Sequence, residues 1–436
     1  MTGAMQGPGG RVVATIGRLR WWIIGLVTIG TILNYLARSS LSVAAPTLKE
    51  ELGMSTEQYA YVVMAFQAAY TVMQPIAGAV LDFMGTRLGF ALFAAAWAIS
   101  NMCHGLATNW QGLAFFRGML GATEAVAMPG GVKVVSEWFP PKERTVATGW
   151  FNMGTSLGGM IAPPLVTFCI LAYNWQIAFV VTGGLSLIWA VMWYVLYRSP
   201  KDHKGLSAAE REHIQDGRKE ETGGKKASWR SIFERREFWG IAIPRFLAEP
   251  AWQTFNFFIP LYLVAAWNLD LKSIALWAWM PFLAADLGSL AGGYLAPFLI
   301  NRMNVSVLAS RKIVMTIGAV CMIGPACIGW ATSPGMAIAL FCIGGFAHQM
   351  LSGALLTLAS DTFEPTAVGR ASGLAGCAGW LGGLLFTYVI GQNADVYGYN
   401  PLFVALAGLD LLGVVVLWAL MRGAKTPAAP TPKLEA

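Results

Sequence analysis

Twelve apolar segments dominate this chain, and each is long enough to cross a membrane as a helix. A helix rises 1.5 Å per residue, so a hydrocarbon core about 30 Å thick needs roughly 20 residues. Charged residues make up 12% of the 436 positions, compared with about 25% in soluble domains. We therefore predict an all-α integral membrane protein with twelve transmembrane helices. The segments cover residues 20–45, 57–82, 88–107, 110–137, 144–172, 175–197, 238–266, 273–300, 308–331, 335–360, 368–394 and 400–422.

One long polar segment, residues 198–237, divides the apolar segments into two sets of six. The domains expected from this division are a cytoplasmic tail (1–19), a six-helix bundle (20–197), a cytoplasmic linker (198–237), a second six-helix bundle (238–422) and a cytoplasmic tail (423–436). Within the linker, Ser207 and Glu210 have the spacing of a capping box, which predicts a short helix. We expect the charges of the linker to lie in solvent.

An internal repeat supports two related halves. Ser136-Glu-Trp-Phe-Pro140 precedes Gly149 in the first half, and Ser360-Asp-Thr-Phe-Glu-Pro365 precedes Gly373 in the second. The distance from serine to glycine is thirteen residues in both cases. Two similar six-helix bundles around a site at the midplane are typical of secondary transporters.

The basic residues predict the orientation. They cluster before the first segment, in every second loop and after the last segment, whereas the opposite loops hold little more than Lys49 and Lys272. The positive-inside rule then places both termini in the cytoplasm. Because the net charge of +7 lies in these loops rather than in one patch, binding to nucleic acid is not indicated. The basic residues concerned are Arg11, Arg18, Arg20, Arg87, Lys142, Arg144, Arg302, Arg311, Lys312, Arg422, Lys425 and Lys433.

The sequence gives no indication of an enzyme. Its six cysteines lie in apolar segments without the spacing of metal ligands, so we read them as small buried residues. We find no nucleophile–base set, metal cluster or phosphate-binding loop. No cofactor and no metal site are expected.

The segment 110–137 contains charged residues that a membrane helix rarely tolerates. Arg117 and Glu124 are seven residues apart, so they share one helix face at a separation of about 10 Å along the axis. A carboxylate near the middle of a span costs roughly 2.5–3.5 kcal/mol on insertion scales, and such groups usually mark substrate or proton pathways. The alternative is a neutralised pair that only locks helices together. Lys133 lies near the end of the segment, where its long side chain can reach the interface.

Two motifs resemble the major facilitator superfamily. Gly78-Ala-Val-Leu-Asp82-Phe-Met-Gly85-Thr-Arg87 matches its loop signature G-x-x-x-D-x-x-G-x-R, and Arg117-Gly-Met-Leu-Gly121 is similar to its motif on the fourth helix. Within the superfamily, Asn34-Tyr-Leu-Ala-Arg38 and Ser136-Glu-Trp-Phe-Pro140 resemble the anion:cation symporter family. The bacterial hexuronate transporters are the most similar subgroup, through Pro244-Arg-Phe-Leu-Ala-Glu-Pro-Ala-Trp252 and Gly344-Gly-Phe-Ala-His-Gln349.

This resemblance implies a proton-coupled symporter in the bacterial inner membrane. It would carry a sugar-acid monoanion such as galacturonate or glucuronate by rocker-switch alternating access, as a monomer surrounded by lipid. Charged groups at the cytoplasmic helix ends would act as gating residues: Asp82, Arg87, Glu137 and Arg144. The open alternatives are transport of an aldonate, tartrate or aromatic carboxylate, exchange instead of symport, and a ligand sensor that does not transport. Exchange stays open because Gly154, Gly158 and Gly159 partly resemble antiporter patterns.

The substrate site is expected around Arg38 and Arg117. Both lie about 10–12 Å inside the same membrane surface, and a guanidinium offers a planar fork of donors to a carboxylate. The alternative is that each arginine pairs structurally or reaches the interface. We expect Tyr35 and Tyr70 to contact the sugar as well. From the second half we expect further contacts by Trp252, Asn256, Gln349 and Ser352.

Glu124 is the main candidate for proton coupling, because burial disfavours its charged form. Much of the family has an acidic residue where this chain has Ala37, so one carboxylate is missing and we favour one proton per monoanion. His348 is a second candidate, although a buried structural histidine is a serious alternative. Arg245 and Glu249, four residues apart, are expected to form a structural pair. Asp286 and Asp410 are expected to brace the bundle.

Overall fold

The computed structural model describes residues 17–140, 143–216, 229–363 and 365–421, and helices dominate it. The predicted tail 423–436 lies wholly outside these residues, as do residues 1–16 of the other predicted tail and residues 217–228 of the predicted linker. In the first half lie α1 (Leu19–Glu51), α2 (Thr56–Met84), α3 (Thr86–Cys103), η1 (His104–Leu106), α4 (Trp110–Glu124), α5 (Ala127–Trp138), α6 (Arg144–Ala172) and α7 (Trp175–Leu196). The linker contains α8 (Ala208–Gln215) and α9 (Trp229–Phe233). In the second half lie α10 (Arg236–Trp267), α11 (Leu271–Trp277), α12 (Met280–Met303), α13 (Val307–Cys321), α14 (Ile323–Ala326), η2 (Cys327–Trp330), α15 (Pro334–Thr362), α16 (Pro365–Tyr397) and α17 (Asn400–Leu420).

Ten helical stretches in the described part of the chain are long and apolar enough to cross a membrane. The other two of the twelve predicted spans are α4 with α5, and α10. The fourth span is interrupted directly after Glu124, where α4 ends and α5 begins at Ala127. Pro129 explains the interruption, because it has no N–H to donate to the carbonyl of Ala125 one turn earlier. The fourth span therefore places its carboxylate at a break in the helix.

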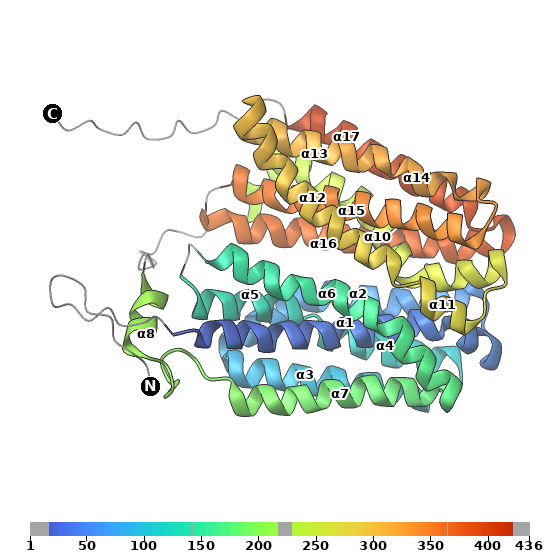
Figure 1. The fold of residues 1–436 in the computed structure, drawn as a ribbon, viewed down its shortest axis with the longest axis horizontal. Helices are drawn as coiled ribbons and strands as arrows, with labels where there is room; N and C mark the ends of the chain where they lie inside the picture. Colours follow the sequence, from blue (N-terminus) through green and yellow to red (C-terminus); the bar gives the residue numbers. More distant parts are fainter. Residues whose placement is uncertain (1–16, 141–142, 217–228, 364, 422–436) are drawn as a thin grey trace.

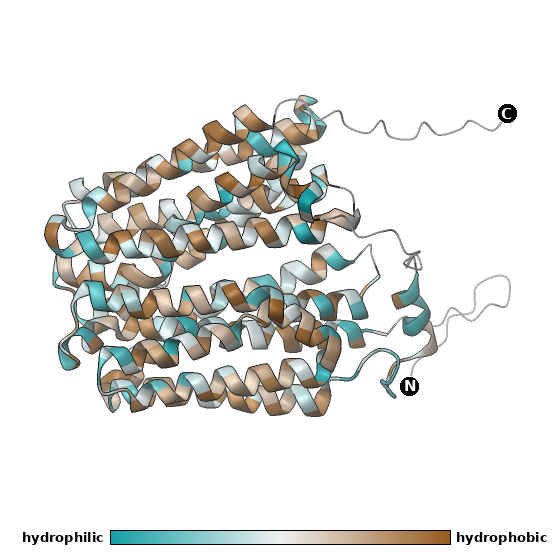
Figure 2. Cartoon of the chain, turned by 180° about the vertical axis from the view of Figure 1, so that it is seen from behind, coloured by the Kyte–Doolittle hydropathy of each residue, from teal (hydrophilic) through white to brown (hydrophobic). Residues whose placement is uncertain are grey.

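The helices form two bundles that lie side by side (Figure 1). In the first, α1 packs against α6, α2 against α4 and α3 against α7; in the second, α10 packs against α16 and α17, and α12 against α15. We call the end at which α8 lies the linker end, and the opposite end, where α11 lies, the far end (Figure 1). Hydrophilic residues gather toward both ends of the helices, with an apolar zone between them (Figure 2).

Close helix packing depends on glycines that recur in both halves. A Cβ on Gly121 of α4 would lie 2.3 Å from the carbonyl oxygen of Phe66, and one on Gly345 of α15 would lie 2.4 Å from that of Pro281. In the other helix pair, a Cβ on Gly158 would lie 2.4 Å from the carbonyl oxygen of Ile32. Such distances leave no room for a methyl group, so the backbones touch directly.

We expect Gly121→Ala to destabilise the protein by about 1–3 kcal/mol, because the added methyl group forces α2 and α4 apart. Thermal unfolding of the purified protein in detergent, followed by tryptophan fluorescence, measures the change. Gly118→Ala is the matched control on the same helix, since its Cβ would lie 3.7 Å from the nearest atom, the carbonyl oxygen of Ala65. Equal unfolding temperatures for the two variants would contradict the packing argument.

The halves are joined by hydrogen bonds toward the far end. Thr56, at the start of α2, donates its backbone N–H and its hydroxyl to the carboxylate of Asp395 on α16, at 3.1 and 2.5 Å. The hydroxyl of Tyr59 donates to the carbonyl oxygen of Phe257 on α10 at 2.9 Å. Ser156 of α6 donates to Asp286 of α12 at 2.5 Å, so Asp286 does brace the bundle.

Asp410, the second expected brace, has no such contact. It is 1% exposed, and neither carboxylate oxygen has a hydrogen-bond partner among the described residues. The prediction that Asp410 braces the bundle through its carboxylate is therefore wrong. Asp410 lies in the middle of α17 and is buried among packed side chains. A carboxylate in such surroundings must have a partner or remain neutral.

The linker helix α8 is fastened to the first half. Ser207 caps it by accepting a hydrogen bond from the backbone N–H of Glu210, as the spacing predicts. The Glu210 carboxylate, however, turns to the start of α1 and accepts from the backbone N–H groups of Leu19 and Arg20 at 3.4 and 3.1 Å. Glu210 is buried, so the expectation that it is solvated is wrong. The unpaired N–H groups of a helix start attract a carboxylate.

Glu143 ties the linker to the loop between α5 and α6. It accepts hydrogen bonds from Arg20 at 2.9 Å and from His213 of α8 at 2.8 Å. Partial burial favours the neutral acid, but these hydrogen bonds outweigh it and lower the pKa of Glu143. Glu143 is therefore ionised at neutral pH, and a charged carboxylate connects α8 to the first half at the linker end.

Candidate functional site

Arg38 and Glu124 form a buried ion pair in the middle of the first half. Arg38 lies on α1 and Glu124 is the last residue of α4. The guanidinium Nε donates to Glu124 Oε2 at 3.0 Å, and the two residues are 4% and 0% exposed. A buried pair of this kind is strongly destabilised when one partner is removed, because the other charge is left uncompensated.

Arg117 lies beside this pair but uses only part of its donor capacity. Its Nη2 donates to the backbone carbonyl oxygen of Arg38 at 2.7 Å. Its Nε and Nη1 are buried and have no hydrogen-bond partner in the described part of the chain. The carboxylate of Glu124 therefore pairs with Arg38 of another helix rather than with Arg117 of its own. Seven residues of helix place Arg117 about 10 Å along the axis from Glu124, so the partner has to come from elsewhere.

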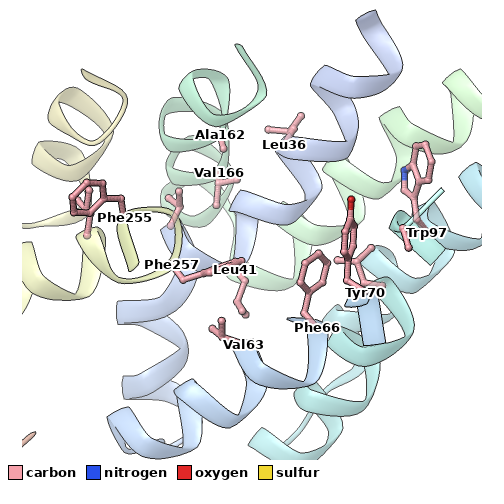
Figure 3. Packing of buried hydrophobic residues seen from close by; sticks show 14 of the residues in the cluster. Leu36, Leu41, Val63, Phe66, Tyr70, Trp97, Ala162, Val166, Phe255 and Phe257 are labelled. Carbon is pink, nitrogen blue, oxygen red and sulfur yellow. The ribbon is translucent and has the colours of Figure 1, made fainter. Parts of the chain in front are cut away.

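Aromatic rings enclose the Arg38 guanidinium. Its Cζ lies 4.4 Å from the ring centre of Tyr35 and 5.0 Å from that of Tyr70, the two tyrosines predicted for the site. Phe66 lies at 5.1 Å, and Trp380 of the second half at 5.8 Å. The rings of Phe66 and Tyr70 lie side by side on α2 (Figure 3). Ring faces attract a cation and replace part of its lost hydration, so Arg38 is held where the halves meet.

Several buried polar atoms of the first half have no hydrogen-bond partner among the residues that the structure describes. They include Glu124 Oε1, Asn34 Nδ2 and both amide atoms of Gln67. An unpaired buried polar group costs about 1–3 kcal/mol, and each one needs an explanation. Of these residues, Glu124 and Asn34 contact the Arg38 guanidinium, so their unpaired atoms could bond to a polar ligand there. Gln67 was missed by our sequence reasoning, although a polar residue three positions before Tyr70 in an apolar span was the available signal.

The second half contributes a pair of stacked rings. The indole of Trp252 on α10 lies parallel to the imidazole of His348 on α15, with centres 5.6 Å apart and planes 9° apart. Nδ1 of His348 is buried, and no described residue forms a hydrogen bond with it. The Asn256 amide donates to the carbonyl oxygen of Trp252 at 2.8 Å. Asn256 also lines a small pocket between the halves with Ser39 and other residues.

Arg245 and Glu249 form the predicted ion pair on α10, with Nη2 and Oε2 2.9 Å apart. Arg245 also donates to the hydroxyl of Ser352 at 2.7 Å, and Glu249 accepts from Gln253 at 3.1 Å. Ser352 is therefore already engaged by a cation. Gln349 is half-buried on the neighbouring turn of α15.

The predicted gating residues tie helix ends together within the first half. Asp82 pairs with Lys133 of α5 at 2.6 Å, so its partner is Lys133 and not Arg87. Arg87 donates to the carbonyl oxygen of Tyr194 at 2.9 Å. The other two show the same pattern: Glu137 accepts from Thr86 and Tyr197, and Arg144 donates to the carbonyl oxygens of Ser136 and Phe139.

Comparison with known proteins now settles the family. A family model described as Major Facilitator Superfamily matches residues 27–310 and, in a second stretch, 298–436. The chain belongs to the major facilitator superfamily. Members of this superfamily are multi-pass membrane transporters, so the protein is a transporter and not an enzyme. The predicted fold, two halves of six transmembrane helices, is confirmed.

Curated relatives and solved structures agree with this assignment. The chain is 52% identical to the hexuronate transporter of Escherichia coli K12 over 93% of its own length and 94% of the relative's. It is 53% identical to the galacturonate transporter of Dickeya chrysanthemi over 74% and 94% of the respective lengths. Among major facilitator structures, the inward open xylose transporter XylE from E. coli shares the fold with a TM-score of 0.72 at 14% identity, over 94% of this chain and 98% of that one.

Proposed function

We propose that the protein is a proton-coupled symporter that carries a hexuronate monoanion, such as galacturonate or glucuronate, into the cell. The observation that carries this proposal is the Arg38–Glu124 ion pair beside Arg117, whose Nε and Nη1 have no hydrogen-bond partner among the described residues. The substrate class follows from the two relatives that are hexuronate and galacturonate transporters by name. We assign contacts with the sugar ring to Tyr35 and Tyr70, and their position beside the Arg38 guanidinium supports this.

Coupling follows from competition for Arg38. When Glu124 is ionised, its carboxylate occupies Arg38 Nε at 3.0 Å. Protonation of Glu124 removes this partner, so Arg38 is left to bind the substrate carboxylate together with the open donors of Arg117. Conversely, a bound anion makes the ionised Glu124 unfavourable through like-charge repulsion, which favours proton uptake. Proton and anion thus bind together, one of each, so the transported pair is electroneutral and the net charge of the site does not change on loading.

Transport then requires the halves to rock about this site. The hydrogen bonds of Thr56 to Asp395 and of Tyr59 to Phe257 hold the far end together, so they must break before the far end opens. We assign the linker end and both termini to the cytoplasm of a bacterial cell, and the protein to its inner membrane; the Lys and Arg at the linker end support this orientation through the positive-inside rule. We take the monomer as the transporting unit, since each chain contains a complete site.

Uptake of labelled galacturonate into proteoliposomes tests the proposal. An inward proton gradient is expected to drive accumulation, and a protonophore is expected to abolish it. Competition by unlabelled glucuronate, galactonate and gluconate ranks the substrates, with glucuronate expected to compete best. Absence of gradient-stimulated uptake for every sugar acid would refute the proposed function.

A further inference from the structure

The glycine contacts give an atomic correspondence between the halves. Gly121 of α4 and Gly345 of α15 each abut a carbonyl oxygen of the neighbouring helix, at 2.3 and 2.4 Å from the position of a Cβ. The two glycines are therefore equivalent positions of the repeat. Three residues after the first lies Glu124, and three residues after the second lies His348. His348 thus occupies the place of the proton-coupling candidate.

The contacts of α6 with α1 and of α16 with α10 identify the residue of the second half that corresponds to Arg38. A Cβ on Gly158 of α6 would meet the carbonyl oxygen of Ile32 on α1, and one on Gly382 of α16 would meet that of Phe246 on α10, at 2.0 Å. Six residues after Ile32 lies Arg38, and six residues after Phe246 lies Trp252. The buried Arg38–Glu124 ion pair of the first half therefore corresponds to the Trp252–His348 ring stack of the second.

The two halves consequently present different charges at equivalent positions. The first half offers two guanidiniums and one carboxylate, so a cation remains for the substrate. The second half offers an indole and an imidazole, and its nearby guanidinium, Arg245, is neutralised by Glu249 at 2.9 Å. Arg245, Glu249 and Trp252 share a face of α10, because their spacings of four and three residues return to the same side of a helix.

We propose that Trp252, His348 and Glu249 restrict the site to substrates with a single carboxylate. This inference rests on the proposed function. A sugar monoacid directs its carboxylate to Arg38 and Arg117 and its uncharged end to the Trp252–His348 stack, where the apolar ring face packs on indole. An aldarate has a carboxylate at each end, so its second carboxylate would lie against the uncharged rings of Trp252 and His348. An unpaired carboxylate removed from water is strongly disfavoured, so specificity arises from the missing cation as much as from the contacts made.

Competition assays measure this selectivity. Against labelled galacturonate, we expect galactarate to inhibit the native protein at least about tenfold less well than glucuronate. In Glu249→Gln, Arg245 is no longer neutralised and is available to a second carboxylate. We expect galactarate to improve at least about tenfold as an inhibitor of this variant, with a much smaller change for glucuronate. Glu249→Asp keeps the charge and is the matched control, expected to retain the native ratio of the two inhibitors.

Two further measurements keep the outcome decisive. His348→Lys introduces a cation beside Trp252 without changing Glu249. It is expected to strengthen inhibition by galactarate in the same way, and it serves as the test if Glu249→Gln is not recovered as folded protein. Thermal stabilisation of the purified native protein by each acid reports selectivity without transport, so a failure of proton-driven uptake is distinguished from a failure of this inference. Equal effects of galactarate and glucuronate on the native protein, or an unimproved galactarate response in both variants, would overturn it.

Discussion

Replacing Glu124 by glutamine is expected to abolish accumulation of hexuronate driven by a proton gradient, while exchange of labelled for unlabelled substrate continues. Glutamine keeps the shape of the side chain but cannot ionise, so the proton-dependent pairing with Arg38 at 3.0 Å disappears. Arg38 is then permanently available to the substrate, and binding no longer depends on proton uptake. Uptake should stop when the internal and external concentrations are equal.

Proteoliposomes with and without an inward proton gradient measure this difference directly. Glu50→Gln is the matched control, because Glu50 is an exposed glutamate near the end of α1. Glu124→Gln loses the buried ion pair with Arg38. Breaking such a pair commonly costs about 3–5 kcal/mol, so the folding of this variant must be verified by thermal unfolding. The four rings around Arg38 limit this loss by continuing to hold the cation. Normal gradient-driven accumulation by a folded Glu124→Gln protein would exclude Glu124 as the proton carrier.

Arg117→Lys should weaken hexuronate binding by about 10- to 150-fold, which corresponds to the loss of a charge-assisted hydrogen bond worth about 1.5–3 kcal/mol. Lysine retains the positive charge but lacks the planar fork that bonds a carboxylate through two atoms. In the native protein, Nη2 of Arg117 donates to the carbonyl oxygen of Arg38, whereas Nε and Nη1 have no partner within the described ranges. A single ammonium group cannot serve both the carbonyl oxygen and a bidentate carboxylate.

The concentration of galacturonate at half-maximal uptake, measured at saturating proton gradient, reports this change. Arg302→Lys, at an exposed position near the end of α12, is the matched control and is expected to behave as the native protein. If Arg117→Lys bound galacturonate with native affinity, the carboxylate would have to be held elsewhere, and the assignment of Arg117 to the substrate site would fall.

The sequence predicts which residues lie together better than it predicts which side chains pair with each other. Arg38, Tyr35, Tyr70, Arg117 and Glu124 were all expected in one site and do lie together. Their depth in the membrane can be calculated from the sequence, because a helix has a fixed rise per residue and the ends of each span are known. The partner of each group was not predictable in this way, because two helices at equal depth can face each other with any rotation.

Contributions from distant segments show the same limit. Trp380 lies on α16, more than three hundred residues after Arg38 in the chain, yet its ring centre is 5.8 Å from the guanidinium. Lys133 looked like a residue that merely reaches the interface, and the structure pairs it with Asp82. Glu210 looked like a solvated linker charge, and it caps the start of α1. Each of these contacts depends on which segments pack together.

The amino-acid sequence by itself determined the twelve spans, the two related halves and the superfamily, because a bilayer imposes the length and the apolar composition of every segment. It also placed two arginines and one carboxylate at depths where only a functional or paired charge is tolerated. The tertiary structure alone decided that Glu124 pairs with Arg38, and that an indole–imidazole stack takes the equivalent place in the other half. The physical reason is that pairing depends on the rotation and neighbours of packed helices, which the periodicity of a single segment does not contain.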